Sequence, residues 1–481
     1  MAEPFGAGSL DGAVLAGARD VGRDGAWSFC DGHATRAAQT AAKPKAARRG
    51  CSFASNTESG PAIALPMHRR AFLLSAAAVS GAAGCAPNDA PPGSVLVPFW
   101  FMYGGRNRTT LEALVARFNR SQADVWVHPV FQGDYFEGLA KLRTALAAGA
   151  APPLSHVIGE VVPYLAEAGV LEPLDDHPGA RELPIHPALG QAGSFEGGAK
   201  RPLVIIPFNR STPIGYVNQR LLEQQGLQAP ATWDELESVA SALTTQGRFG
   251  FGCPTDWWFW AALVGQAGGE IVRFDGTVTL GGAAGVEALK LWQRMVRAGS
   301  MKPPPGRDFN AWEQLSQDFL AGRVAMMWSS TAFLRYLEET ADFPVRALPL
   351  PVGTRAAVPT GGTHFVVLKS APTELKQAAW RFVRYMLETE PAAYWSSETG
   401  YLPVTTPAVT QLQANGFYAK HPNYLVALHQ LRVARPWPWS PGLFRIQREI
   451  IQPRLEATVL EDRDALKVLR EARALARESL P

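Results

Sequence analysis

A short polar stretch flanked by two prolines contains residue types that can hold a small polar ligand. Asn209, Ser211 and Thr212 supply hydrogen-bond donors and acceptors within it. Pro207 and Pro213 fix the backbone φ angle and remove two backbone donors, and the apolar run 203–206 before them is typical of a buried strand. The pattern predicts a strand that ends at residue 206 and then presents polar groups. A proline-interrupted edge strand with a polar turn has the same sequence features.

Three further polar residues follow predicted strands. Tyr135 follows a strand at 125–131, Glu160 one at 156–159, and Ser329 one at 323–328. Ligands of α/β sheets bind outside the carboxyl ends of strands. We therefore expect these three side chains near a ligand.

Two other segments have both a structural and a functional interpretation. Thr232 and Glu235 form a capping box that starts a helix with Trp233, which explains the segment without any ligand. Gly361 and Gly362 precede a predicted strand at 364–368. Adjacent glycines let backbone N–H groups approach a ligand closely, and they are equally typical of a plain turn.

Strands and helices alternate along the chain from residue 95. The first strand is predicted at 95–101, and the helix after it starts at Thr109 or Thr110, with an apolar stripe of Leu111, Leu114, Val115 and Phe118. Further helices are predicted to run from about 135 through 148 and over 283–297, 309–320 and 374–388. This order predicts an α/β fold with mostly parallel sheets and crossover helices.

The composition excludes several classes of function. The 481 residues are 47% hydrophobic and 19% charged, with a net charge of +3 and no long basic run, so nucleic acid is not expected as a partner. Four cysteines without zinc-type spacing indicate neither a disulfide framework nor a metal site. The sequence lacks HExxH, GxSxG and P-loop motifs. A hydrolase that uses Asp134 and Glu160 as a glycosidase pair is the alternative from another class.

The first 94 residues are predicted to lie outside the folded domain. Residues 1–66 lack periodicity and are interpreted as a disordered extension or an error in the assigned start, with translation beginning at Met67. Residues 67–84 resemble a lipoprotein signal peptide with a twin-arginine pair at Arg69 and Arg70, and Cys85 is the expected lipidation site before a tether at 85–94. An internal loop with a chance cysteine is the alternative.

Several motifs from residue 94 onward resemble one protein family. They are Pro98-Phe99-Trp100, Phe208-Asn209-Arg210-Ser211-Thr212-Pro213 with Tyr216 and Asn218, Thr232-Trp233, Thr399-Gly400-Tyr401-Leu402-Pro403, Gly416-Phe417-Tyr418 and Gly442-Leu443. The chain is similar to the extracellular solute-binding proteins of ABC importers, carbohydrate type. This resemblance implies two α/β lobes, 95–208 with 352–400 and 209–351 with 401–481, hinged near 207–216, 344–351 and 399–404. Ligand is then trapped in the cleft between the lobes.

The same resemblance implies a ligand and its contacts. Within the family, the motifs resemble those of members that bind sn-glycerol-3-phosphate, and a glycerophosphodiester or an uncharged mono- or oligosaccharide are the alternatives. The implied ligand residues are Tyr135, Glu160 and Ser211 for the glycerol hydroxyls, Trp233 for the carbon backbone, and Ser329, Gly362, Tyr401 and Arg448 for the phosphate. Arg445 is the alternative to Arg448. The resemblance further implies a monomeric periplasmic protein that delivers solute to an inner-membrane ABC permease, with no cofactor, no metal and no catalysis.

Overall fold

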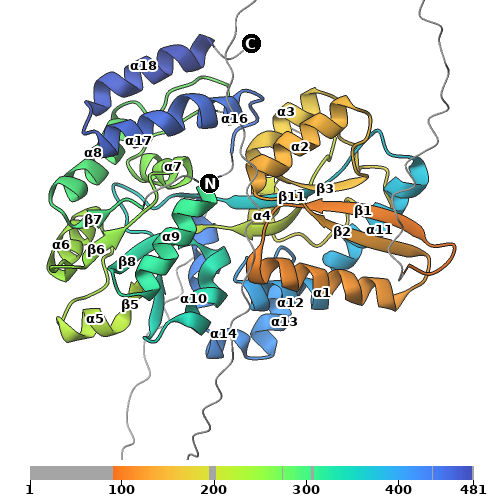
Figure 1. Cartoon of the computed structure of the whole chain (residues 1–481), viewed down its shortest axis with the longest axis horizontal. Coiled ribbons are helices and arrows are strands. Elements are labelled where there is room, and N and C mark those ends of the chain that lie inside the picture. The colour runs from red at the N-terminus through yellow and green to blue at the C-terminus, as the bar shows by residue number, and fades with distance from the viewer. Residues whose placement is uncertain (1–89, 194–201, 274, 305–307, 436, 479–481) are drawn as a thin grey trace, which may run out of the picture. The chain divides into compact units, whose positions relative to one another are not determined.

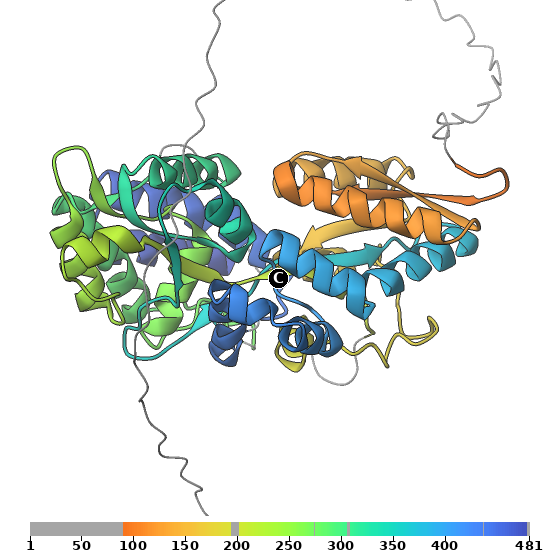
Figure 2. The same ribbon diagram turned by 90° about the horizontal axis from the view of Figure 1, so that it is seen from below.

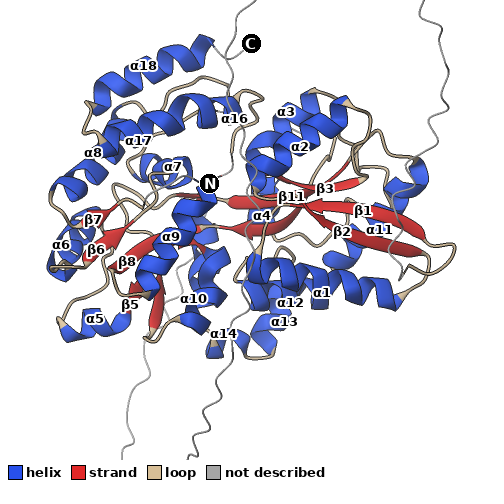
Figure 3. Ribbon diagram, viewed as in Figure 1, coloured by secondary structure: helices blue, strands red, loops and turns tan. Residues whose placement is uncertain are grey.

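The computed structural model describes residues 90–193, 202–273, 275–304, 308–435 and 437–478 (Figure 1). The expectations for residues 1–66, for the signal peptide at 67–84 and for lipidation at Cys85 lie outside these residues. The described chain contains two five-stranded sheets flanked by helices (Figure 3), which confirms the predicted α/β class.

The first sheet has the strand order β2-β1-β3-β11-β4. Its strands are β1 (Val95–Phe101), β2 (Val125–Phe131), β3 (Leu154–Ile158), β4 (Ile206–Ser211) and β11 (Gly361–Val367). Strand β1 pairs in parallel with β2 and β3, whereas β11 is antiparallel to β3 and β4. The first sheet and the helices packed on it are called lobe 1.

The second sheet has the strand order β7-β6-β8-β5-β9 and, with its helices, is called lobe 2. Its strands are β5 (Pro213–Asn218), β6 (Phe249–Gly252), β7 (Met301–Lys302), β8 (Val324–Ser330) and β9 (Val345–Leu348). Strand β6 is parallel to β7 and β8, and β5 is antiparallel to β8 and β9. In each sheet, half of the strand pairs are therefore parallel and half are antiparallel. The sheets are mixed, whereas the sequence predicts mostly parallel ones. The short strands β10 (Val358–Pro359) and β12 (Ala434–Arg435) form a separate pair.

Helices cover both faces of the first sheet, with α2 and α3 on one side and α1 on the other (Figures 1 and 3). Figure 2 shows the same two groups of elements after a quarter turn. The helices are α1 (Gly105–Ser121), α2 (Tyr135–Ala147), α3 (Val162–Glu167), α4 (Pro187–Gly193), α5 (Gln219–Gln224), α6 (Trp233–Leu243), α7 (Trp257–Gln266), α8 (Ala283–Arg297), α9 (Asp308–Leu320), α10 (Leu334–Thr340), α11 (Thr373–Met386), α12 (Thr389–Thr399), α13 (Thr406–Ala414), α14 (Phe417–Lys420), α15 (Asn423–Gln430), α16 (Leu443–Arg445), α17 (Gln452–Leu460) and α18 (Ala465–Glu478). No helix within the described residues combines the length and apolar composition needed to cross a membrane.

The apolar stripe of α1 is buried as predicted, but the helix starts earlier than predicted. Leu111, Leu114, Val115 and Phe118 are at most 3% exposed. The helix begins at Gly105, and its N-cap residue Gly104 makes no side-chain hydrogen bond. The predicted threonine caps therefore lie inside the helix, and the absence of a capping side chain at the true start explains the error.

The polar stretch that follows Pro207 is a strand, so the prediction that the strand ends at residue 206 is wrong. Strand β4 starts at Ile206 and continues through Ser211, and β5 starts two residues later in the other sheet. The chain thus crosses between the sheets at Thr212. Pro207 is tolerated because β4 is the edge strand of its sheet, and Pro213 because it is the first residue of β5.

Two other strands include residues that were expected to flank them. Strand β8 runs through Ser329 and Ser330, whose partners in β5 are Ile214 and Pro213. Strand β11 includes the glycine pair, because Gly361 and Gly362 lie opposite Ser211 and Arg210 of β4. In both cases, pairing with a strand distant in sequence extends the strand beyond its apolar run.

Candidate ligand-binding site

Tyr135 and Tyr401, two of the predicted ligand residues, lie close together in the structure. Asp134 caps helix α2, accepting hydrogen bonds from two backbone N–H groups, and Tyr135 is the first helical residue. Tyr401 follows Gly400, which ends α12 in the left-handed conformation with a φ of 96°. The two hydroxyl oxygens lie 3.4 Å apart. Burial raises the pKa of both hydroxyls, so both are protonated and can donate hydrogen bonds at neutral pH.

Glu160 lies in the turn that directly follows β3, as predicted. It is part of a 3₁₀ turn, Gly159–Val161, and is only 7% exposed. Burial raises the pKa of its carboxyl to about 7, against the lowering effects of a backbone hydrogen bond and of the Arg210 charge. Asp256 raises it further, which places a second carboxylate nearby. At neutral pH the Glu160 carboxyl is therefore present in both protonated and ionised forms.

Arg210 is a buried cation at this site that the sequence interpretation missed. It is 1% exposed, and its Nη1 and Nη2 donate hydrogen bonds to the Gly362 carbonyl at 3.1 Å and to Thr360 Oγ1 at 2.8 Å. Burial lowers its pKa to about 10, against the raising effects of Glu160, Tyr135 and Tyr401, so these groups surround it. Strand β4 is buried along its whole length, and this burial of Arg210 is visible only in the structure.

Ser211 and Ser329 lie on the two sides of the chain crossing. Both are almost completely buried. The Oγ of Ser329 has no hydrogen-bond partner among the described residues, so it can accept one from a ligand. A Cβ on Gly361 would lie 3.2 Å from Ser211 Oγ and 2.6 Å from the Trp258 ring. The missing side chain at Gly361 therefore allows Trp258 and Ser211 to approach this part of β11.

The glycine at position 362 is explained by strand packing. Its φ is +89°, and a Cβ there would lie 1.8 Å from the Asn209 carbonyl oxygen. Any larger residue would collide with the neighbouring backbone. A ligand contact is not needed to account for this glycine.

The structure brings Trp258 to the site and keeps Trp233 in other contacts. The Trp233 indole N–H donates to Gln266 Oε1 at 2.9 Å, and its ring lies against Gly353. Trp258 instead stacks on Trp312, with ring centroids 5.6 Å apart, and Trp312 stacks on Phe333 at 6.2 Å. Trp312 and Phe333 are partly exposed, so this aromatic row has an accessible side. The dense tryptophan segment at the start of α7 was the sequence signal.

Arg448 lies beside the helix that carries Tyr135. It belongs to a π-helical segment, Ile446–Ile451, and its guanidinium carbon is 3.6 Å from the centroid of the Phe136 ring. π-Helical turns often occur at functional sites. The rival Arg445 points to solvent and forms an ion pair with Glu449 at 3.1 Å. The geometry favours Arg448 over Arg445 as the cation of the C-terminal segment.

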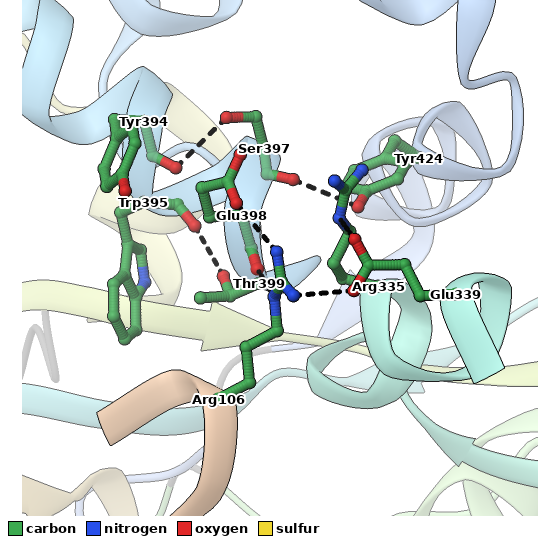
Figure 4. A network of polar contacts seen from close by, with 9 residues as sticks. All are labelled: Arg106, Arg335, Glu339, Tyr394, Trp395, Ser397, Glu398, Thr399 and Tyr424. Carbon is green, nitrogen blue, oxygen red and sulfur yellow. Dashed lines mark hydrogen bonds and ion pairs between the residues drawn. The ribbon is translucent and has the colours of Figure 1, made fainter. Parts of the chain in front are cut away.

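A second polar network connects the two lobes at the start of α1 (Figure 4). Arg106 donates from Nη1 to Glu339 of α10 at 2.6 Å and from Nη2 to Glu398 of α12 at 2.8 Å. Helix α12 packs on α1 in lobe 1, whereas α10 packs on α9 and β9 of lobe 2 and also on α12. The bond to Glu339 therefore crosses between the lobes.

A hollow of about 550 Å³ lies away from these residues. It is lined by His186 of the loop before α4 and by residues of α4, α13 and α15, among others. None of the predicted ligand residues lines it. Among the predicted ligand residues, Glu160, Ser211, Ser329 and Tyr401 are buried, whereas Tyr135, Trp233, Gly362 and Arg448 are partly exposed.

Comparison with known proteins supports one family. Residues 113–425 match the family described as bacterial extracellular solute-binding protein. The sn-glycerol-3-phosphate-binding periplasmic protein UgpB of Pectobacterium atrosepticum is 27% identical over 369 residues, which are 72% of this chain and 82% of that protein.

Solved structures agree with this match. The crystal structure of UgpB from Mycobacterium tuberculosis in complex with glycerophosphocholine has 26% identity and a TM-score of 0.68, and it covers 80% of this chain and 98% of that one. The GacH receptor of Streptomyces glaucescens has a TM-score of 0.72 at 21% identity, with coverage of 80% and 98%, and is similar in fold.

These proteins are solute-binding proteins and not enzymes, which decides against the glycosidase alternative. Solute-binding proteins of this kind take up small sugars or polyol phosphates and work with ABC permeases. Because the family match covers more than half of the sequence, the chain belongs to the bacterial extracellular solute-binding proteins, the extracytoplasmic components of ABC importers.

Proposed function

We propose that this protein binds sn-glycerol-3-phosphate or a glycerophosphodiester and delivers it to an inner-membrane ABC permease. The observation that carries this proposal is the buried group around the paired hydroxyls of Tyr135 and Tyr401. An acid, Glu160, is close enough to Tyr135 to raise the pKa of its hydroxyl, and a cation, Arg448, packs on the ring of Phe136, the residue that follows Tyr135 in α2. A carboxyl group suits hydroxyl donors and a guanidinium suits phosphate oxygens, so the arrangement orients a molecule that carries both.

The remaining ligand residues have proposed roles on either side of this axis. Glu160, Tyr135 and Ser211 bind the glycerol hydroxyls, while Tyr401, Ser329 and Arg448 bind the phosphate. The unpartnered Ser329 Oγ supports its role. The backbone of Gly362 and the ring of Trp233 remain proposed contacts, although Trp258 is better supported as the aromatic surface because it lies beside Gly361.

Hinge closure is part of the proposed function. The proposed lobes are 95–208 with 352–400 and 209–351 with 401–481, connected near 207–216, 344–351 and 399–404. The backbone N–H of Leu402 donates to the Arg210 carbonyl at 2.8 Å, which supports two adjacent connections that bend together. Ligand binding stabilises the closed form because the lobes contribute contacts from opposite sides.

The relatives named above support the choice of ligand class. Both UgpB proteins are associated with glycerophosphate compounds. One is named for binding sn-glycerol-3-phosphate, and the other was crystallised in complex with glycerophosphocholine. A thermal-shift screen with these two compounds, maltose and inorganic phosphate tests the proposal. A ligand that binds only the native state raises the melting temperature. A shift with maltose and none with the glycerophosphates would contradict it.

An uncharged mono- or oligosaccharide is the second candidate. The stacked row of Trp258, Trp312 and Phe333 favours it, because flat aromatic faces pack against the apolar faces of sugar rings. The same thermal-shift screen separates the two ligand classes.

We further propose that Cys85 is lipidated and anchors the protein to the membrane. The proposal rests on the charged, apolar and small-residue segments that precede this cysteine in the sequence. Mass spectrometry of the purified native protein tests it through the mass of the first peptide. An unmodified Cys85, or peptides recovered from residues 1–66, would contradict it.

A further inference from the structure

The buried guanidinium of Arg210 has donors that the protein itself does not satisfy. Of its five N–H groups, one on Nη1 and one on Nη2 have acceptors among the described residues. Its Nε is buried and has no partner there. Buried polar groups in native proteins are nearly always hydrogen-bonded, so such a group needs an explanation.

Nearby carboxylates do not neutralise this cation by direct pairing. Within the described part of the chain, Arg210 has no ion pair with an acid, although Glu160 is close enough to affect its charge. Burial raises the pKa of Glu160 to about 7 and lowers that of Arg210 only to about 10. At neutral pH the guanidinium is thus fully charged, while part of the Glu160 population is neutral.

The surroundings of Arg210 are those of the ligand site. The Tyr135 and Tyr401 hydroxyls lie close enough to influence its charge, and Asn209 lies beside both of these hydroxyls. Its bond to the Gly362 carbonyl fixes the guanidinium against β11. A fixed cation with free N–H groups surrounded by neutral hydroxyl donors is suited to an oxyanion.

We propose that Arg210 contacts the anionic group of the ligand, so that the site selects a phosphate monoester or diester over a neutral sugar. This inference rests on the proposed function and extends it. Arg210 binds from the strand crossing, where the Tyr401 hydroxyl is close enough to influence its charge. A phosphate carries several acceptor oxygens, so it can accept hydrogen bonds from both side chains.

Calorimetry on variants provides the first test, with sn-glycerol-3-phosphate and glycerophosphocholine as probes. Arg210→Gln should weaken binding of the phosphate ester about 10- to 100-fold, the range for a lost charge-assisted hydrogen bond. Arg210→Lys keeps the charge and should recover part of the affinity. Arg445→Gln removes an exposed arginine and should bind like the unaltered protein. Far-UV circular dichroism verifies that each variant is folded.

Nuclear magnetic resonance of the unaltered protein labelled with ¹⁵N-arginine provides a test that does not depend on a Gln variant folding. The Arg210 Nε–H signal is identified by its loss in Arg210→Lys. We expect this signal to shift when either phosphate ester is added, because a phosphate oxygen then accepts a hydrogen bond from Nε–H. A purely structural arginine would leave it unchanged.

The outcomes separate the two proposals. If the unaltered protein binds neither phosphate ester, the proposed function fails and the role of Arg210 fails with it. If it binds one of them while the Nε–H signal stays unchanged at saturation, or while folded Arg210→Gln keeps full affinity, only the role of Arg210 is overturned. A response to the diester alone would identify a glycerophosphodiester as the ligand.

Discussion

The hydroxyl oxygens of Tyr135 and Tyr401 lie 3.4 Å apart although the two residues are 266 positions apart in the chain. One begins helix α2 and the other follows the left-handed end of α12. The contact brings residues with separate predicted roles, one for hydroxyls and one for phosphate, to the same point. In the proposed complex, neighbouring side chains would therefore bind the two ends of the ligand.

Arg448→Ala should weaken binding of sn-glycerol-3-phosphate about 10- to 100-fold. The substitution removes a charge-assisted hydrogen bond, which stabilises a complex by about 1.5–3 kcal/mol. Isothermal titration calorimetry measures the change. Arg445→Ala serves as the matched control, because its ion pair with Glu449 is exposed and lies outside the site. Equal affinities for the two variants would remove Arg448 from the phosphate contacts.

Gly362→Ala should destabilise the fold by at least about 3 kcal/mol. The new Cβ would combine a φ of +89° with a collision against the Asn209 carbonyl oxygen. Urea unfolding measures the loss of free energy. Gly416→Ala is the control, since Gly416 also has a positive φ, of +75°, but has open space around its Cβ position. The control should lose only about 1–2 kcal/mol.

A stable Gly362→Ala protein that fails only in ligand binding would reverse the interpretation. Gly362 would then serve the ligand through its backbone N–H, as the sequence resemblance implies. A similar loss of stability in both glycine variants would mean that φ alone, and not the close approach of β4, requires a glycine here.

The sequence was most informative where local pattern alone decides an element. Strands β1 and β2 and helix α8 have the predicted bounds. Each combines a run or stripe of apolar residues with a clear boundary, such as the turn residues that follow Phe131 or the Gly282 that precedes α8. Thr232 and Glu235 form the predicted capping box, because that motif needs only residues three positions apart.

The errors arose where partners distant in sequence decide the structure. Strands β4, β8 and β11 extend into polar residues because they pair with one another or with β5 across long separations. The role of Arg210 was missed for the same reason. An isolated sequence predicts an exposed arginine, and its partners Thr360 and Gly362 lie about 150 positions away.

Glu160→Gln should change how stability depends on pH. The carboxyl has a pKa of about 7 in the folded protein because it is buried, against about 4.3 in the unfolded chain. Between these values the folded state holds more protons than the unfolded state, so stability contributed by Glu160 is present below pH 4.3 and is lost as the pH rises to 7. Glutamine does not titrate, so the Glu160→Gln variant does not lose this stability as the pH rises.

Unfolding by urea at pH 5 and pH 8 measures this effect. The unfolding free energy of Glu160→Gln minus that of the unaltered protein should be about 2 kcal/mol larger at pH 8 than at pH 5. Glu235→Gln is unsuitable as a control because Glu235 caps a helix, so the exposed Glu390→Gln is used instead. An identical pH profile for Glu160→Gln and the unaltered protein would show that Glu160 titrates as an ordinary surface acid.

Arg106→Gln should favour the open form of the protein without greatly lowering its stability. The Arg106 bond to Glu339 crosses between the lobes, whereas its bonds to Glu398 stay within lobe 1 (Figure 4). The groups are partly exposed, so we expect the bond to Glu339 to stabilise the described arrangement of the lobes over a more open one by at most about 1 kcal/mol, or about fivefold in the equilibrium constant. Arg108→Gln is the matched control, because Arg108 pairs with Glu112 within α1.

Spin labels on Tyr164→Cys in lobe 1 and Leu466→Cys in lobe 2, both exposed positions, report the distance between the lobes. Only Arg106→Gln should increase the population with a longer distance, and an equal change in both variants would mean that Arg106 does not hold the lobes together.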